Sequence, residues 1–289
     1  MRSSAYRGLS EHTKAPRPFS RHGMVYRMIL TKGLRLRRSL DRSVSSDAWT
    51  VATSLRDDRT VDRIVRNQSE VVQMILSNTE ITRNHMTPEI KLFLLTPNCK
   101  LYRTPFRDVL EEDPMKKVFQ EPFWSIYWPG GQALTRFILD QKEMFQPSKK
   151  GISVLDVGAG CGASAIAAKL AGARRVVAND IDEVACTAIS MNAVLNNVDI
   201  EVSPDDLLQG PAKGLADIIF IGDMLYDEEI AGSLIVWLEN ALVSGARIFL
   251  GDPGRHGLTN DLKKRLVPLK RYSLPENVRR ENHGFDECT

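Results

Sequence analysis

The stretch VLDVGAGCGASAIAAKLAGARRVVANDID, residues 154–182, decides the fold of this 289-residue chain. An apolar run up to Val157 predicts a buried strand, and three glycines follow it at Gly158, Gly160 and Gly162. Because glycine has no Cβ atom, a turn built from glycines lets the backbone contact a ligand closely. About twenty residues after the turn, a second apolar run ends in Asp180, whose carboxylate can accept hydrogen bonds from a ribose diol. The pattern predicts a strand–turn–helix–strand unit that binds a nucleoside-containing cofactor.

Two cofactor classes fit this turn, and a third interpretation is structural. Gly158, Gly160 and Ala163 satisfy the short dinucleotide pattern G-x-G-x-x-G/A. Asp156 and the additional Gly162 extend the match to D-x-G-x-G-x-G, which favours S-adenosylmethionine. This cofactor has no pyrophosphate and does not need a helix N-terminus as an anion site; it needs a close backbone flanked by acids. A glycine turn that only permits tight packing is the structural alternative. The turn resembles that of seven-strand methyltransferases.

Strand and helix patterns alternate from residue 152 onward, which predicts a parallel sheet covered by helices on both faces. The fold class is therefore α/β, with a doubly wound, mostly parallel, Rossmann-like sheet and a helical extension on its N-terminal side. We expect strands at Ile152–Val157, Arg175–Asp180, Ile200–Ser203, Ala216–Asp223 and Ala246–Asp252. We expect helices at Gly162–Ala171, Glu183–Asn196 and Glu228–Val243.

The N-terminal extension carries helical signals of its own. Apolar residues recur at helical spacing between Val61 and Leu76 and predict one amphipathic helix. Thr87-Pro88-Glu89 then predicts the start of a short helix that ends near Pro97.

Asp223 and Tyr226 follow a predicted strand and should lie at the same carboxyl edge as the glycine turn. An acid and an aromatic residue three positions apart in such a place are candidates for a reacting centre. Asp223 could hold an incoming ammonium group, and Tyr226 could contact it by a cation–π interaction or a hydrogen bond. The alternative for Asp223 is that it caps the helix that follows.

Two further residues are candidates for the cofactor site. Trp128, followed by Pro-Gly-Gly, could form a rigid aromatic wall over an adenosine or beside the acceptor entry, or it could belong to an aromatic core cluster. Asp205, after the third predicted strand, could bond an adenine amino group or be an exposed turn acid.

The charge is unevenly distributed. Residues 1–40 hold ten bases and one acid, so the rest of the chain carries a net charge of about −6 although the total is +3. An arginine-rich, acid-poor N-terminus predicts a mitochondrial transit peptide, although a basic tail or a nucleic-acid arm remains an alternative. The acidic remainder suits a basic, lysine-bearing protein surface.

Other classes of site lack support in the sequence. No segment approaches the roughly 18 apolar residues of a membrane helix. The four cysteines form no C-x-x-C pair, and the five histidines show no spacing typical of metal ligands or a catalytic triad. We therefore expect no metal, no membrane and no nucleic-acid partner, and we expect a monomer.

Five motifs in order resemble one methyltransferase family: SIYWPGGQAL, VLDVGAGCGASAIAAKLAGA, ANDID, GDMLYDEE and GDPGR. This family is the electron transfer flavoprotein β-subunit lysine methyltransferases. The resemblance implies an S-adenosylmethionine-dependent enzyme of the mitochondrial matrix that methylates lysines of the electron transfer flavoprotein β-subunit. It implies that Asp223 and Tyr226 are catalytic. It assigns the following residues to the cofactor: Trp128, Asp156, Gly158, Gly160, Gly162 and Asp180, with Asp205 as the further candidate named above.

The resemblance divides the chain into a transit peptide at 1–40, a helical extension at 41–121 and a methyltransferase domain at 122–289. The chain ends at Thr289, where the family would begin its final sheet strand, so either the last strand is incomplete in this sequence or the sheet closes with fewer strands. Three alternatives remain for function. The first is a methyltransferase that acts on another protein, such as a ribosomal protein, or on a small molecule. The second is a pseudoenzyme that binds without catalysis, and the third is a NAD-dependent oxidoreductase.

Overall fold

The computed structural model describes residues 69–103, 122–145, 151–281 and 284–289. The predicted transit peptide, the residues around Val61 and the two predicted domain boundaries lie outside the described residues. The three-part division of the chain therefore stays a proposal.

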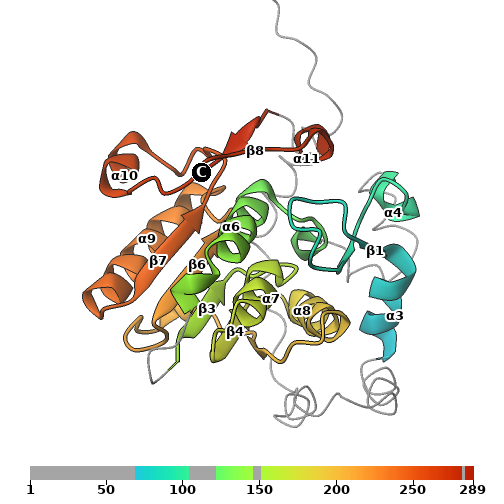
Figure 1. Ribbon diagram of the computed structural model, residues 1–289, viewed down its shortest axis with the longest axis horizontal. Helices are drawn as coiled ribbons and strands as arrows, with labels where there is room; N and C mark the ends of the chain where they lie inside the picture. The colour runs from blue at the N-terminus through green and yellow to red at the C-terminus, as the bar shows by residue number, and fades with distance from the viewer. Residues whose placement is uncertain (1–68, 104–121, 146–150, 282–283) are drawn as a thin grey trace, which may run out of the picture. The chain divides into compact units, whose positions relative to one another are not determined.

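A five-stranded parallel sheet forms the centre of the fold, with strand order β5-β4-β3-β6-β7 (Figure 1). The strands are β3 (Ser153–Val157), β4 (Arg175–Asn179), β5 (Glu201–Ser203), β6 (Ile218–Gly222) and β7 (Arg247–Gly251). The chain adds strands outward from β3 on one side of the sheet and outward from β6 on the other. The crevice between the carboxyl ends of β3 and β6 is therefore a topological switch point, where such sheets bind ligands. The predicted fold class is confirmed, and each predicted strand lies within three residues of its observed bounds.

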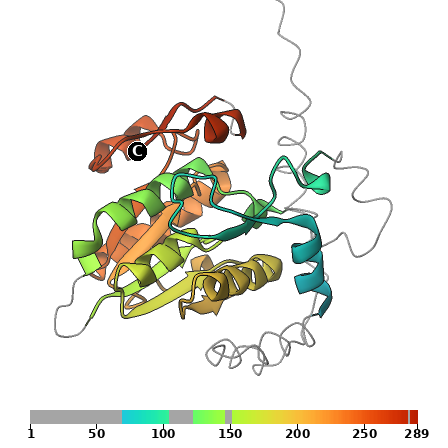
Figure 2. The same cartoon turned by 45° about the vertical axis from the view of Figure 1, so that its right-hand side comes forward.

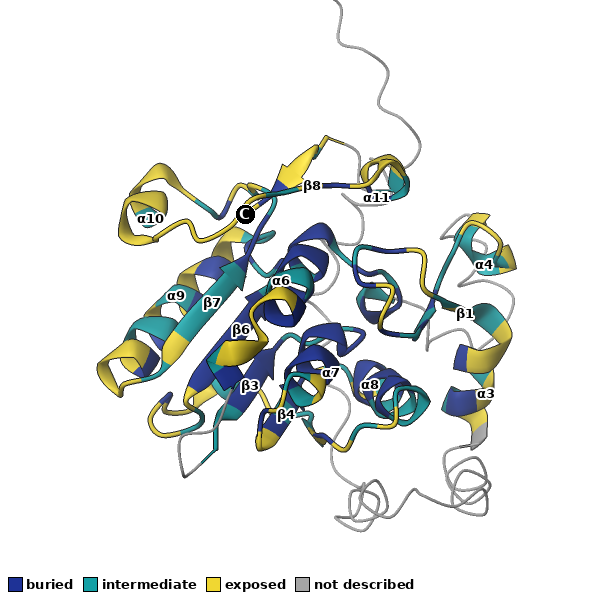
Figure 3. Ribbon diagram, in the orientation of Figure 1, coloured by how far each residue is buried: buried dark blue, intermediate teal, exposed yellow. Residues whose placement is uncertain are grey.

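Alternate residues of each central strand face the two sides of the sheet. In β6, Ile218 and Phe220 belong to one core cluster and Ile219 and Ile221 to the other. The first cluster packs under α6 (Pro129–Asp140), α7 (Ala163–Leu170) and α8 (Glu183–Leu195), and the second under α9 (Glu228–Val243) (Figure 2). Buried residues line the sheet side of α7 and α9, while the outer face of α9 is exposed (Figure 3).

The described part of the N-terminal extension is not purely helical. It contains α3 (Ser69–Asn78), β1 (Glu80–Thr82), β2 (Leu92–Leu94) and α4 (Lys100–Arg103), and β1 and β2 pair antiparallel. The helix predicted after Pro88 is wrong. The side chain of Asn192 on α8 accepts a hydrogen bond from the backbone N–H of Phe93 at 2.8 Å, so contacts with α8 hold this segment extended.

The C-terminal part packs against α6 and pairs with the chain just after β7. After β7 come α10 (Asn260–Arg265), β8 (Tyr272–Ser273), α11 (Glu276–Glu281) and β9 (Glu287–Cys288), and β8 pairs antiparallel with β9. Thr289 exchanges two backbone hydrogen bonds with Asp252, at 3.0 and 3.1 Å. This exchange is the pattern of a hydrogen-bonded antiparallel pair, so the last residue pairs beside the end of β7.

Short 3₁₀ helices complete the described elements: η4 (Phe123–Ser125), η5 (Lys142–Phe145) and η6 (Leu207–Gln209). Within the described ranges, no helix has the length and apolar character that crossing a membrane requires.

Candidate cofactor and acceptor site

The glycine turn after β3 has a backbone that other residues rarely adopt. Gly158, Gly160 and Gly162 have φ angles of 63°, 55° and 77°, in the left-handed region that favours glycine. A Cβ atom on Gly158 would also collide with the side chain of Met224, which follows β6. The turn therefore presents bare backbone between the ends of β3 and β6, as the sequence predicted.

Asp156 shapes this turn from inside the strand. Gly162 is the N-cap of α7 and has no side chain to cap it, and Asp156 Oδ2 accepts a hydrogen bond from the backbone N–H of Ala165 at 3.0 Å. The carboxylate thus satisfies one free donor in the first turn of α7. Burial raises the pKa of Asp156 to about 7.

Asp180 lies at the end of β4 and holds the other side of the turn. Its Oδ2 accepts a hydrogen bond from Gly160 N–H at 2.9 Å, and its Oδ1 accepts one from Asp182 N–H at 3.1 Å. Burial raises the pKa of Asp180 to about 6. Asp180 therefore positions the glycine turn whether or not it also bonds a ribose.

The raised pKa of Asp156 predicts a stability that depends on pH. An acid whose pKa is higher in the folded chain binds more protons when folded, so the free energy of unfolding falls as pH rises from about 4 to about 7. Asp156→Asn should reduce that fall by on the order of 4 kcal/mol. Urea denaturation of the cofactor-free chain at several pH values measures it. Asp261→Asn, at an exposed site, is the control, and an equal fall in Asp156→Asn and the unaltered chain would contradict the prediction.

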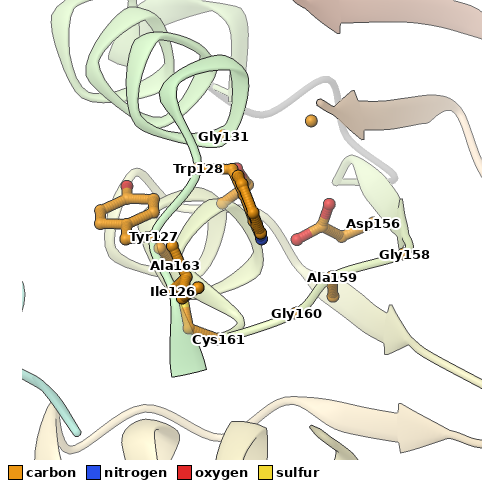
Figure 4. Close-up of a pocket in the computed structure, with 12 residues that line it drawn as sticks. Ile126, Tyr127, Trp128, Gly131, Asp156, Gly158, Ala159, Gly160, Cys161 and Ala163 are labelled. Carbon is orange, nitrogen blue, oxygen red and sulfur yellow. The ribbon is translucent and has the colours of Figure 1, made fainter. Parts of the chain in front are cut away.

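Trp128 and Asp156 face one pocket beside the glycine turn (Figure 4). Trp128 is the N-cap residue of α6, with Pro129 at the first helical position, and its indole Nε1 donates a hydrogen bond to the carbonyl of Phe123 at 3.0 Å. The pocket joins residues from the segment before α6, from β3 and its turn, and from the end of β6. Its lining is Ile126, Tyr127, Trp128, Gly131, Asp156, Gly158, Ala159, Gly160, Cys161, Ala163, Ser164 and Gly222.

The aromatic segment before α6 contains one residue in the pocket wall and another in a core cluster, the two locations that the sequence left open. Trp128 lines the pocket, whereas Trp124 is 1% exposed and belongs to a core cluster with α3 and α8. Phe123 bridges the two candidate regions, because its ring centroid lies 6.2 Å from that of Trp128 and 6.2 Å from that of Tyr226. Tyr226 is therefore joined through Phe123 to Trp128 in the wall of the pocket.

Asp223 is buried and adopts a left-handed backbone conformation with φ of 62°. Its Oδ2 accepts a hydrogen bond from Gly130 N–H at 2.6 Å, and its Oδ1 accepts one from Arg255 Nε at 2.6 Å. The alternative that Asp223 caps α9 is wrong, because Asp227 is the N-cap residue and accepts from the N–H groups of Glu229 and Ile230. Asp223 is free of that role and lies beside the N-terminus of α6.

Asp205 lies apart from the first pocket. Its carboxylate accepts a hydrogen bond from Ser203 Oγ at 2.8 Å, its carbonyl accepts one from Asn179 Nδ2 at 2.9 Å, and its side chain is exposed. It lines a second hollow between β4, β5 and η6. The structure therefore places Asp205 near the end of β5 without bringing it to the glycine turn, and its role in binding adenine stays a prediction.

The sequence did not reveal the close contact between α6 and the strand ends. A Cβ atom on Gly130 would collide with the carbonyl oxygen of Gly251 and lie 2.8 Å from the backbone nitrogen of Asp223. A Cβ atom on Gly222 would lie 2.9 Å from the Cα of Gly131. The Pro-Gly-Gly signal suggested a rigid turn, but only the fold shows that its glycines contact the glycines at the ends of β6 and β7.

A buried polar chain on the far side of the pocket was also missed. Tyr127 OH lies 3.2 Å from Thr87 Oγ1, which lies 3.1 Å from His85 Nδ1. Burial lowers the pKa of His85 to about 4, so this histidine is neutral at physiological pH. The described part of the N-terminal extension thus contacts the pocket wall through Tyr127. No local sequence motif predicts this contact.

Comparisons with known proteins agree with this geometry. The family model for ribosomal protein L11 methyltransferase (PrmA) matches residues 130–226, which span the glycine turn and Asp223. The electron transfer flavoprotein beta subunit lysine methyltransferase of Mus musculus is 43% identical over 212 residues, with 72% of this chain and 78% of that protein covered. The protein of the same description from Xenopus laevis is 39% identical over 261 residues, with 89% and 97% covered.

A ribosomal protein L11 methyltransferase from Caldicellulosiruptor saccharolyticus is 53% identical over 123 residues, but the match covers 42% of this chain and 37% of that protein. Its similarity is thus confined to a part of the fold, whereas the similarity to the first two relatives includes most of both chains.

The described residues fit the cofactor of a methyltransferase, S-adenosylmethionine. Bare backbone at Gly158 and Gly160 lines the pocket, and a buried carboxylate and an aromatic ring face the pocket beside it. These features and the relatives that match most of their length confirm the predicted enzyme class and cofactor. This chain belongs to the family of electron transfer flavoprotein beta subunit lysine methyltransferases and is an S-adenosylmethionine-dependent methyltransferase.

Proposed function

We propose that this chain methylates lysine side chains of the electron transfer flavoprotein β-subunit in the mitochondrial matrix. The observation that carries the proposal is the match to the Xenopus laevis relative, a lysine methyltransferase of this description, over 97% of that protein's length. The basic residues at 1–40 support the location, and the net negative charge of the remaining residues favours a lysine-rich partner surface. In this proposal the enzyme acts as a monomer and requires no metal.

The residues around the glycine turn have the chemistry to hold the cofactor. When bound, S-adenosylmethionine supplies an electrophilic methyl group on a sulfonium. Asp156 and the turn at Gly158–Gly162 would receive the methionine part, with the buried carboxylate facing its ammonium group. Asp180 would accept hydrogen bonds from the ribose diol, and Trp128 would cover the pocket. Asp205 would reach the adenine amino group only if the base extends toward η6.

Asp223 and Tyr226 would receive the acceptor lysine. A carboxylate has about four lone-pair sites, and Asp223 uses two of them for Gly130 and Arg255. A neutral lysine amine can donate to a remaining site while its lone pair forms the new N–C bond. The sulfur of the donor would keep the electron pair of the broken C–S bond, and the methylammonium product would later release a proton to water. Alignment of the two reactants can contribute roughly 7–11 kcal/mol to such a transfer.

Radiolabelled methyl transfer tests this function. The full chain is incubated with labelled S-adenosylmethionine and purified electron transfer flavoprotein β-subunit, and the labelled residues are identified by mass spectrometry. We expect label on lysines of the β-subunit. Cofactor binding without label on this protein would overturn the proposed substrate, and absence of cofactor binding would favour the pseudoenzyme alternative.

Methylation of ribosomal protein L11 is the second candidate, because the PrmA family model spans the cofactor turn and Asp223. Equal amounts of L11 and the β-subunit in one reaction separate the two candidates. We expect label on the β-subunit alone, since the L11 enzyme matches less than half of this chain. Preferential label on L11 would reverse the assignment.

A further inference from the structure

Arg255 is held tightly against the carboxylate of Asp223. The guanidinium Nε lies 2.6 Å from Asp223 Oδ1, and the side chains of Arg255 and Asp223 are 17% and 2% exposed. Arg255 belongs to the loop after β7, whereas Asp223 follows β6, so adjacent strands bring the pair together. The ion pair is therefore a largely buried structural feature at the carboxyl ends of β6 and β7.

Two aromatic rings fix the guanidinium in place. Its central carbon lies 5.5 Å from the ring centroid of Trp128 and 4.8 Å from that of Phe285, both within cation–π range. The loop itself is anchored, because Asp252 Oδ1 accepts hydrogen bonds from the backbone N–H groups of Gly254 and Arg255, both at 2.7 Å. Arg255 is thus positioned by three separate elements.

The charge of Asp223 alone would work against methyl transfer. A free lysine has a pKa of about 10.4, and an unpaired carboxylate in contact with it favours the ammonium form further. An ammonium nitrogen has no lone pair and cannot attack a methyl group. A cation on the same carboxylate has the opposite effect, because like charges disfavour the charged form of the lysine.

We propose that Arg255 is a positioning residue that neutralises Asp223, so that the acceptor lysine binds there as a neutral amine. The proposal rests on the proposed function of Asp223 as the site that receives the lysine. Arg255 itself touches neither the reacting nitrogen nor the methyl group. Its contribution is electrostatic and requires a positive charge within contact of the Asp223 carboxylate.

The other ionisable groups near this pair are few among the described residues. Asp252 lies at the end of β7, and burial raises its pKa. Burial likewise raises the pKa of the Cys288 thiol on β9, which keeps this group neutral. Asp252 adds negative charge to the cluster, so the single guanidinium at Arg255 must offset two carboxylates when both are ionised.

The pH profile of Arg255→Gln tests the proposal. The pH dependence of kcat reports the pKa values of groups in the enzyme–substrate complex. We expect its acidic limb to move upward by about one to three pH units, because a charge in contact shifts a pKa by that amount. At pH 7, kcat should then fall at least about tenfold while KM stays the same or decreases. Activity should recover near pH 10, and Arg255→Lys should restore the original limb because it keeps the charge.

Controls separate this role from a structural one. His256→Gln changes the next, exposed residue of the loop and should leave the profile unaltered. Thermal denaturation of each variant reports folding. If Arg255→Gln lowers kcat equally at all pH values, or if Arg255→Lys is as defective as Arg255→Gln, the electrostatic role is wrong.

A second measurement does not depend on the identity of the substrate. Binding of n-butylamine to the enzyme loaded with S-adenosylhomocysteine is followed by calorimetry in buffers of different ionisation enthalpy at pH 8. We expect close to one proton released per amine bound by the unaltered chain and fewer by Arg255→Gln. Binding without proton release by the unaltered chain would overturn the inference. Failure to methylate the β-subunit would instead overturn the proposed substrate, and the proton count would still decide the role of Arg255.

Discussion

Asp223→Asn is expected to bind S-adenosylmethionine as the unaltered chain does and to lose at least about 100-fold in kcat. Asparagine has the size of aspartate and tolerates the left-handed backbone of this residue, whose φ is 62°. Its amide oxygen can still accept the hydrogen bond that Gly130 N–H donates. Asparagine lacks the negative charge and half of the acceptor sites, and its NH2 group takes the place of the oxygen that accepts from Arg255 Nε. Single-turnover methyl transfer and a cofactor titration measure the two effects separately.

Asparagine is a sharper test here than alanine. Alanine would remove the acceptors of both Gly130 and Arg255 and would be strained at a positive φ, so it would mix a larger folding defect with the catalytic one, whereas asparagine keeps the acceptor for Gly130. Asp227→Asn is the matched control, because this acid lies four residues away, caps α9 and is replaced by an equally good capping residue. A loss of cofactor binding in Asp223→Asn would assign Asp223 a structural role, and full activity would show that another residue receives the lysine.

Gly130→Ala is expected to destabilise the fold by at least about 2 kcal/mol and to abolish most activity. The added Cβ would meet the carbonyl oxygen of Gly251 and would lie 2.8 Å from the backbone nitrogen of Asp223, and neither backbone group can rotate away. Relief of the clash must move α6 from the strand ends, which breaks the hydrogen bond from Gly130 to Asp223. A displacement of about 1 Å at a reacting group can cost about 100-fold in rate.

Gly131→Ala is the matched control in the same helical turn. Its Cβ would lie 3.6 Å from the Tyr127 ring, an ordinary van der Waals distance. Alanine is favoured over glycine in a helix by roughly 0.5–1 kcal/mol, so this variant should be as stable as the unaltered chain or slightly more stable. Urea denaturation of the two variants measures the difference. Equal stability of Gly130→Ala and Gly131→Ala would contradict the close approach of α6 to β7.

The sequence alone predicted the parallel sheet and the glycine turn because both depend on local constraints. Strands buried on both faces require continuous apolar runs, and such runs occur at β3, β4, β6 and β7 but not at the edge strand β5, whose sequence is EVS. The turn requires residues that adopt positive φ angles, and Gly158, Gly160 and Gly162 meet that requirement. Chain order and the handedness of the crossovers then bring Asp156 and Asp223 to one edge.

Prediction of the N-terminal extension failed for a physical reason. Thr87-Pro88-Glu89 is a good helix start, but local propensity is a weak influence compared with tertiary contacts. Asn192 and Asn196 on α8 accept hydrogen bonds from the backbone N–H groups of Phe93 and Lys91. Those donors are about 100 residues away in sequence, so no local pattern contains the information.

The sequence by itself thus determined the fold class, the enzyme family and the identity of the residues at the sheet edge. Only the tertiary structure decided the surroundings of those residues. Arg255 lies 32 positions from Asp223 and yet shares its carboxylate with Gly130. The strength of an electrostatic interaction depends on the distance between the two charges and on how far they are buried. The folded chain sets both by packing together segments that are remote in sequence.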